Sequence, residues 1–224
     1  MSASFGVFFR IAAGGGALLS GAAAMALAKG SPPHRVAGTV FALAMLTTAG
    51  SAVILAGFVR PTMPAFVEGL LAFYLAASAW ATVLHRERTT NLADHAILFI
   101  GLGAAAAGVT IGLEAAHSPK GLKEGIPAAF FYAFAAIAAL GAAFDLKVIA
   151  QGGIAGRNRI TRHLWRMTTA FFLAVVNFFA GNGAKIFPAE IVRTKLLLVP
   201  VLITLALLIF WIIRVRLTNW YKEA

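Results

Sequence analysis

The sequence of 224 residues contains no cysteine. Disulfide bonds, thiolate nucleophiles and cysteine-ligated metal centres are therefore excluded. Charged residues are also scarce, at 12% of the chain, whereas soluble domains carry about 25%. So little charge cannot cover a globule in water, which indicates that lipid solvates much of the protein surface.

Acidic residues are the scarcest of the charged types. Eight Asp and Glu stand against nineteen Lys and Arg, which gives a formal net charge of +11. In a soluble protein this excess would suggest nucleic acid as a partner. In a membrane protein, Lys and Arg mark cytoplasmic loops and contact anionic headgroups. Because 60% of the residues are hydrophobic, we expect the lipid bilayer as the partner and no nucleic acid.

Several motifs that would indicate an enzyme or a transporter are missing. The sequence has no Walker loop, no dinucleotide-binding fingerprint, no Gly-x-Ser-x-Gly elbow and no His-Glu-x-x-His string. It also shows no internal repeat of the kind from which many transporters are built. These absences favour a non-catalytic protein and leave its biochemical role open.

Long apolar runs dominate what the sequence does contain. Continuous runs of about twenty apolar residues are typical of transmembrane helices and differ from the alternating strands of a barrel. We therefore predict an all-α, polytopic transmembrane bundle that forms a single domain over residues 1–224. Its seven helices are expected roughly at 7–28, 36–58, 63–84, 96–113, 126–149, 164–182 and 195–215.

The distribution of Lys and Arg predicts the orientation of these helices. If the N-terminus is outside, twelve of the cations fall on the cytoplasmic side and seven on the outer side. The positive-inside rule then favours an N-out, C-in arrangement. All four tryptophans also fall at the expected cytoplasmic interface. We expect a multi-pass protein of the bacterial cytoplasmic (inner) membrane.

Few polar side chains lie deep within the predicted helices. An ionisable residue there costs roughly 2.5–3.5 kcal/mol and is a site hypothesis by default. Glu68 and Asn177 lie in the outer half, and one hypothesis is that they line the path of a transporter or channel. Asp145 lies near the cytoplasmic end of the fifth helix. The favoured interpretation for Asp145 is a structural ion pair with Arg162 or Arg166.

The five histidines suggest a second hypothesis. Four of them lie at predicted cytoplasmic helix ends: His34, His85, His95 and His163. Imidazole suits haem iron and divalent metals, so His34 and His163 could hold haem b, or a divalent metal with Asp145 as a third ligand. The same three ligands could activate water in a membrane hydrolase. Interface anchoring and structural hydrogen bonding are the alternatives that need no cofactor.

Small residues recur every four positions in two of the helices. The stripes are Gly16, Ser20 and Ala24 in the first helix, and Ala104, Gly108 and Gly112 in the fourth. Such stripes let helices approach closely in lipid. We expect them to serve packing within the bundle or a contact between two copies of the chain.

Two sequence strings are distinctive. One is Lys29-Gly30, followed by His34-Arg35-x-x-Gly38, and the other is Arg162-His163-Leu164-Trp165-Arg166-Met167. With Phe73-Tyr74-Leu75 they resemble, over most of the chain, a group of bacterial seven-helix inner-membrane proteins of the domain-of-unknown-function type. The resemblance implies a seven-helix membrane fold and no particular activity. It singles out His34, Arg35, Asp145, Arg162, His163, Trp165 and Arg166, of which Arg35, Asp145, Arg162 and Arg166 suit structural ion pairs.

The favoured interpretation is therefore a non-catalytic membrane protein, either an accessory subunit or an assembly factor. It would act as part of a homodimer or of a larger membrane complex. The haem or metal site at His34 and His163, and the transport path at Glu68 and Asn177, remain the alternatives.

Overall fold

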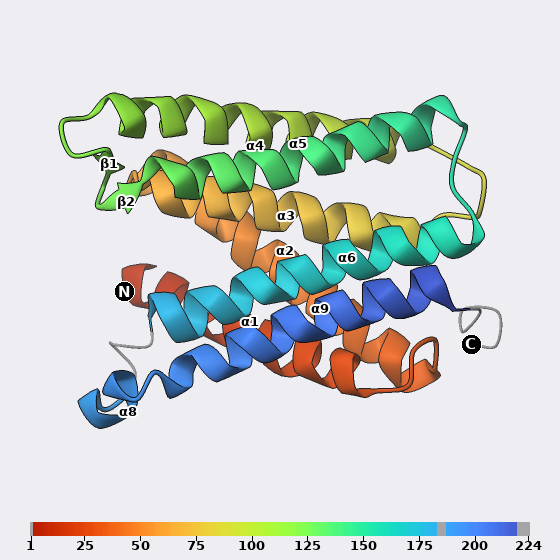
Figure 1. Cartoon of the computed structure of the whole chain (residues 1–224), viewed down its shortest axis with the longest axis horizontal. Helices are drawn as coiled ribbons and strands as arrows, with labels where there is room; N and C mark the ends of the chain where they lie inside the picture. Colours follow the sequence, from red (N-terminus) through yellow and green to blue (C-terminus); the bar gives the residue numbers. More distant parts are fainter. Residues whose placement is uncertain (1, 183–186, 219–224) are drawn as a thin grey trace. The chain divides into compact units, whose positions relative to one another are not determined.

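The computed structural model describes residues 2–182 and 187–218, with side chains from Ala12 onward, and Figure 1 shows the arrangement of the elements. Apart from one short hairpin, its regular elements are helical. The α-helices are α1 (Ser2–Ala26), α2 (Pro32–Ile54), α3 (Met63–Leu84), α4 (Leu92–His117), α5 (Ala128–Ala150), α6 (Gly156–Val175), α8 (Ala189–Arg193) and α9 (Val199–Leu217). Two π-helical turns, η1 (Leu55–Val59) and η2 (Val176–Gly181), extend α2 and α6, and a 3-10 turn, η3 (Leu196–Leu198), precedes α9.

Six of the described helical segments are long and apolar enough to cross a membrane. They are Pro32–Val59, Met63–Leu84, Leu92–His117, Ala128–Ala150, Gly156–Gly181 and Leu196–Leu217. A shorter apolar stretch, Ala12–Ala26, forms the second half of α1. The prediction of an all-helical, multi-pass membrane protein is thereby confirmed.

Some helix boundaries differ from those expected. α3 occupies the predicted residues 63–84, but α6 begins at Gly156, eight residues before the predicted start at 164. The first turns of α6 are rich in arginine, and a search for apolar runs does not detect a helix whose first turns are polar. α4 (Leu92–His117) likewise extends beyond the expected 96–113 at both ends. Its start is fixed by Asn91, whose side-chain oxygen accepts hydrogen bonds from Ala93 N and Asp94 N.

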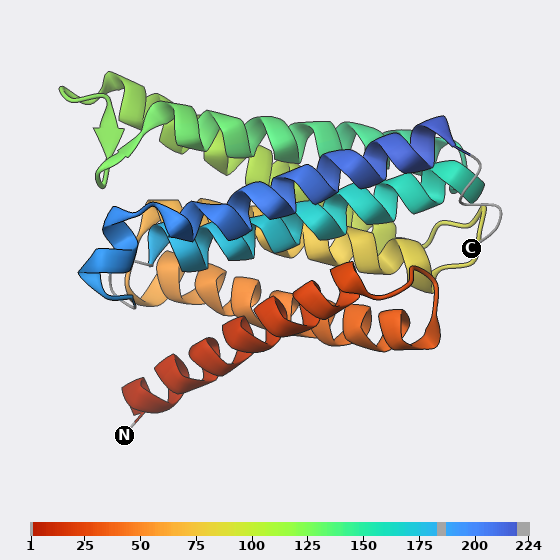
Figure 2. The same cartoon turned by 60° about the horizontal axis from the view of Figure 1, so that its bottom comes forward.

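The chain divides into two compact units. Unit 1 comprises residues 1–44 and 156–224, and unit 2 comprises residues 45–155. Within unit 1, α6 and α9 lie side by side and antiparallel, and within unit 2 the same holds for α4 and α5 (Figures 1 and 2).

The small-residue stripe of α4 brings α4 and α5 into close contact. A Cβ atom added at Gly108 would lie 2.9 Å from Ala135 Cβ and 3.0 Å from Phe131 O. At Gly112, an added Cβ would lie 2.6 Å from the Tyr132 ring. The α4 stripe therefore serves packing within the chain, which is the first of the two roles expected for it.

Gly108→Ala is expected to lower the free energy of unfolding by about 1–3 kcal/mol, because the added methyl group meets the α5 backbone. Gly103→Ala is the matched control, since nothing lies within 4 Å of a Cβ at that position of the same helix. The control should be neutral or slightly stabilising, because alanine favours helix over glycine. Thermal unfolding in one detergent compares the variants, and equal midpoints would contradict the close approach.

A β-hairpin joins α4 to α5 and caps α3. Strand β1 (Leu122–Lys123) pairs antiparallel with β2 (Ile126–Pro127), with Lys123 opposite Ile126. Glu124 and Gly125 both have positive φ, as a two-residue type I′ turn requires. The Glu124 carboxylate accepts hydrogen bonds from Met63 N at 3.1 and 3.2 Å. An acidic group at this position satisfies an otherwise unpaired amide at the start of α3.

In unit 1 two aromatic rings pack against a glycine of α1, where a larger residue would not fit. A Cβ atom at Gly21 would clash with the Phe171 ring and lie 3.0 Å from the Phe41 ring. These rings, from α6 and α2, meet edge to face with centroids 5.8 Å apart. Nothing lies within 4 Å of a Cβ at Gly16, whose carbonyl accepts the Ser20 hydroxyl instead. In α1, therefore, the close contact is made at Gly21, outside the predicted stripe.

Candidate functional site

A buried pair of polar side chains lies in unit 2. Tyr74 of α3 is 0% exposed and Asp145 of α5 is 1% exposed. The Tyr74 hydroxyl donates to Asp145 Oδ2 at 2.5 Å, at the short end of the range for O–H···O hydrogen bonds. A buried carboxylate in a membrane span needs such a donor, because no water is available to solvate it.

Two glycines make room for the Tyr74 ring. A Cβ atom added at Gly101 of α4 would lie 2.6 Å from ring atom Cε2, and one at Gly141 of α5 would lie 2.7 Å from the hydroxyl oxygen. Gly141 is one turn before Asp145 on the same helix. Three helices of unit 2 thus meet around one tyrosine, whose hydroxyl donates a hydrogen bond to Asp145.

Sequence reasoning singled out Asp145 but assigned no role to Tyr74. A signal was present, because Tyr74, Ser78 and Thr82 recur every four residues and form a polar line along apolar α3. All three are buried. The Ser78 hydroxyl donates to Leu75 O at 3.1 Å and the Thr82 hydroxyl to Ser78 O at 2.7 Å. A buried tyrosine hydroxyl generally has a hydrogen-bond partner, and this expectation could have directed attention to Asp145.

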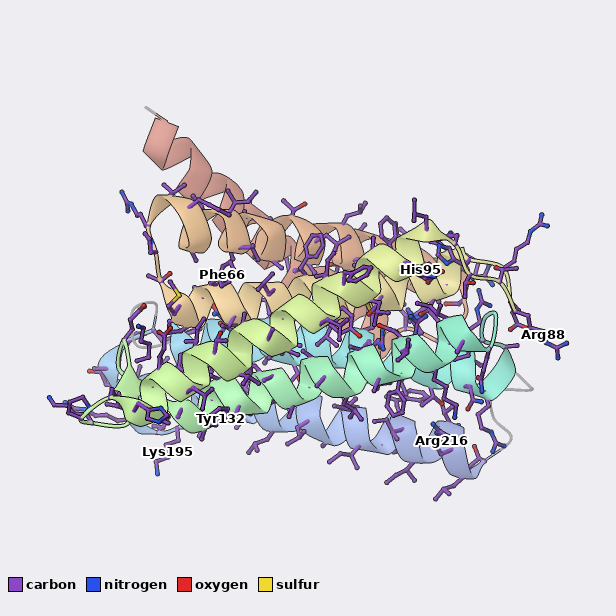
Figure 3. All side chains as sticks on the ribbon, turned by 90° about the horizontal axis from the view of Figure 1, so that it is seen from above. Phe66, Arg88, His95, Tyr132, Lys195 and Arg216 are labelled. Atoms are coloured by element: carbon purple, nitrogen blue, oxygen red, sulfur yellow. The ribbon has the colours of Figure 1, made fainter. Side chains whose placement is uncertain are left out.

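Two histidines flank the turn between α3 and α4: His85 follows the end of α3, and His95 lies in the first turn of α4. His85 Nδ1 lies 3.2 Å from Asp94 Oδ2, and Asn91 Nδ2 lies 3.0 Å from His85 Nε2. The geometry suits a ring whose Nδ1 donates to Asp94 and whose Nε2 accepts from Asn91. His95 Nδ1 lies 3.0 Å from the backbone oxygen of Asn91. Figure 3 shows His95 and Arg88 at this end of unit 2. Both histidines therefore contact Asn91, the residue that caps the start of α4.

The string Lys29-Gly30…His34-Arg35 closes the turn between α1 and α2. His34 Nδ1 lies 3.0 Å from Ala24 O, a carbonyl in the last turn of α1. Arg35 Nε donates to Gly30 O at 3.0 Å, and Gly30 itself has a φ of 80°. A glycine just beyond a helix end commonly adopts this left-handed conformation. The string is thus explained by the geometry of a helix C-terminus.

Lys29 completes this cap. Its Nζ donates to Ala24 O at 3.0 Å and to Met25 O at 2.6 Å, and it lies 4.8 Å from the centroid of the Trp211 ring. A cation at the C-terminus of a helix interacts favourably with the helix dipole. Partial burial lowers the pKa of the Lys29 ammonium from its ordinary value, and the carbonyl oxygens offset that loss of hydration.

The second string lies within α6. Arg162 and Arg166 are buried, Arg166 completely, and His163 is half-buried. The Arg166 guanidinium carbon lies 5.1 Å from the centroid of the Trp165 ring, which is within cation–π range. The predicted ion pair of Asp145 with Arg162 or Arg166 would join residues of different units, and it stays a prediction.

Among the described residues, no group of three or more His, Asp or Glu side chains could hold a metal ion. The hypotheses of haem b or a divalent metal at His34 and His163, and of a hydrolase with Asp145 as a further ligand, stay predictions. What the structure does show is that His34 and Asp145 each have a hydrogen-bond partner of another kind.

The two residues of the predicted transport path lie in different units. Glu68 is half-buried in α3 of unit 2. Asn177 lies in η2 of unit 1, where it is exposed. Asn182 Nδ2 lies 3.0 Å from both Asn177 O and Asn177 Oδ1, at the end of the π-helical turn. The transport path stays a prediction.

Comparisons of the chain with family models, with curated proteins and with solved structures find no match.

Proposed function

We propose that the chain is a non-catalytic protein of the bacterial inner membrane, an accessory subunit or an assembly factor of a membrane complex. The observation that supports this proposal best is the cap on α1. Lys29 and His34, which belong to the most distinctive string of the first half of the chain, bind the carbonyl oxygen of Ala24. Both side chains thus bind the backbone of the turn in which they lie. This contact stabilises the fold, and a stabilising role requires no substrate or cofactor.

The proposal includes a seventh membrane span and an orientation. α1 has 25 residues, which at 1.5 Å per residue suffices to cross a hydrocarbon core of about 30 Å. With α1 counted, the positive-inside rule gives an N-out, C-in arrangement. The turn before α4, which contains Arg86 and Arg88, then lies in the cytoplasm, and the hairpin after α4 lies outside.

A visible absorption spectrum and a metal analysis of the purified full chain test the cofactor-free part of this proposal. We expect no Soret band and no stoichiometric metal. His34→Ala should lower the free energy of unfolding by about 0.5–1.5 kcal/mol, because one hydrogen bond of the α1 cap is lost, and thermal unfolding measures this change. A Soret band or bound metal that disappears in His34→Ala would contradict the proposal and favour the alternative cofactor site.

The size of the particle in gently solubilised native membranes tests the accessory role. We expect the chain to migrate in an assembly larger than its own dimer, with at least one other protein present in fixed proportion. A particle that contains only this chain, whether monomeric or dimeric, would contradict an accessory role. The measurement uses the chain at its native level of expression, because overproduction leaves an accessory subunit without its partners.

A further inference from the structure

The whole excess of positive charge lies in unit 1. Residues 1–44 and 156–224 hold thirteen of the nineteen Lys and Arg but two of the eight Asp and Glu, a difference of +11. Residues 45–155 hold six of each and are formally neutral. Within the described part of unit 1 the one carboxylate is that of Glu190, on α8. An asymmetry of this size predicts an anionic partner for unit 1.

Many of these cations gather at one end of unit 1, where α6 begins and α9 ends. Arg157 Nη1 donates to Arg216 O at 3.3 Å, which joins the start of α6 to the last turn of α9. One turn earlier on α9, the Trp211 ring has the Arg214 guanidinium at 5.6 Å and the Lys29 ammonium at 4.8 Å from its centroid. These contacts connect three separate segments of the chain.

Arg35 extends the cluster, since its side chain is held against Gly30 in the turn that contains Lys29. We call these residues the basic end of unit 1: Lys29, Arg35, Arg157, Arg214 and Arg216. Arg35, Arg214 and Arg216 are exposed. Figure 3 shows Arg216 and Lys195 at opposite ends of α9. The basic end is therefore separated from Lys195 by the length of a membrane span.

The surface beside the basic end is apolar. On α9, Phe210 is 48% exposed, Ile213 is 51% exposed and Leu217 is 78% exposed. These side chains share the last two turns of the helix with Arg214 and Arg216. The Trp211 ring, which two cations of the basic end approach, lies in the same part of α9, and indole rings are common at the level of lipid headgroups. Cations above an exposed apolar column match a molecule with an anionic head and acyl chains.

We propose that the basic end of unit 1 is a binding site for an anionic phospholipid, with the lipid phosphate among its exposed arginines, which are Arg35, Arg214 and Arg216, and the acyl chains along α9. Guanidinium groups suit this role because they bind phosphate oxygens with two parallel hydrogen bonds. The site does not depend on the proposed accessory function or on the orientation of the chain. A cluster that acted only as a topological signal would show no lipid preference once the protein is folded and purified.

The test measures binding of phosphatidylglycerol to the full chain in mixed micelles, with phosphatidylcholine as the neutral comparison. Retained lipid is counted by native mass spectrometry over a range of lipid concentrations, and thermal midpoints are measured in the same micelles. Phosphatidylglycerol should be retained and should raise the midpoint, whereas phosphatidylcholine should do neither. Inorganic phosphate should have no effect, because it lacks the acyl chains.

Matched variants locate the site. Arg35→Gln with Arg216→Gln removes two charges from the basic end and is expected to weaken phosphatidylglycerol binding on the order of 10- to 100-fold. Arg193→Gln with Lys195→Gln removes two charges near the opposite end of α9 and should leave the affinity unchanged. Arg35→Lys with Arg216→Lys keeps the charge and should retain the preference for the anionic lipid.

Three results would overturn the proposal: equal retention of both lipids, equal stabilisation by inorganic phosphate, or equal losses in the two glutamine variants. The midpoint of each variant in phosphatidylcholine shows whether it is folded. If the Arg35→Gln and Arg216→Gln variant does not fold, the salt dependence of the wild-type chain decides. Phosphatidylglycerol binding that is unchanged at high salt would then overturn the proposal, since screening must weaken an electrostatic site.

Discussion

Tyr74→Phe is expected to lower the free energy of unfolding by about 1–3 kcal/mol, although it removes a single oxygen atom. The ring can stay where Gly101 and Gly141 make room for it, so no cavity of importance forms. What is lost is the hydrogen bond from the Tyr74 hydroxyl to Asp145 Oδ2 at 2.5 Å. Asp145 is 1% exposed, and water cannot replace the missing donor without opening the helix packing.

Thermal or denaturant unfolding in a single detergent measures this loss. Tyr132→Phe is the control, because Tyr132 is an exposed tyrosine of α5, whereas Tyr74 is completely buried. The control should change the free energy of unfolding by less than about 0.5 kcal/mol. Equal effects of the two substitutions would show that the Tyr74 hydroxyl contributes nothing specific.

A double-mutant cycle with Asp145→Asn identifies the partner. The amide side chain introduced by that substitution still offers an oxygen to the Tyr74 hydroxyl, but a hydrogen bond to a neutral acceptor is weaker than one to a carboxylate. Tyr74→Phe should therefore cost less in the Asp145→Asn background than in the wild-type chain. A cost that is the same in both backgrounds would mean that the two residues are not coupled.

The helices could be predicted from the sequence because burial in lipid leaves a one-dimensional signal. The apolar run at 63–84 became α3 over the same residues. The start of α6 could not be predicted in this way. Residues 156–163 contain Arg157, Arg159 and Arg162, and they form a helix whose polar turns carry no apolar run. Helical propensity was the remaining signal, and it is too weak over two turns to fix a boundary.

The roles of single residues were harder to predict, because they depend on which atoms the fold brings together. The sequence predicted that His34 lies at a helix end. It also gave the two alternatives for this side chain, a ligand of haem or metal and a partner in a structural hydrogen bond. That its Nδ1 lies near Ala24 O depends on the turn at Gly30, which reverses the chain over ten residues. Tyr74 was missed for the same reason, since its partner is on another helix, 71 positions along the chain.

Labelling of single cysteines is expected to give an almost all-or-none result for the orientation of α4. The chain has no cysteine, so each introduced thiol is the only reactive site. Glu87→Cys and Pro119→Cys place thiols at exposed positions just before and just after α4, and neither alters the number of Lys and Arg residues. The positive-inside signal is therefore unchanged.

In the N-out, C-in arrangement, a membrane-impermeant maleimide should label Pro119→Cys in intact spheroplasts. Glu87→Cys should be labelled only after the membrane is permeabilised, because a charged reagent does not cross the hydrocarbon core. Labelling of both variants in detergent verifies that each thiol is reactive. The reverse pattern would contradict the predicted orientation, and labelling of both variants in intact spheroplasts would mean that the chain inserts both ways.

The same reagent decides whether α1 is a seventh span. Ala28→Cys lies at an exposed position just after α1, and Ser4→Cys lies in its first turn. If α1 crosses the bilayer, Ser4→Cys should be labelled from outside and Ala28→Cys only after permeabilisation. Six spans would put both positions on one side. The result also bears on Lys29, whose ammonium group binds the backbone at the end of α1. A charged side chain at this position requires the end of α1 to lie at a membrane surface and not within the hydrocarbon core.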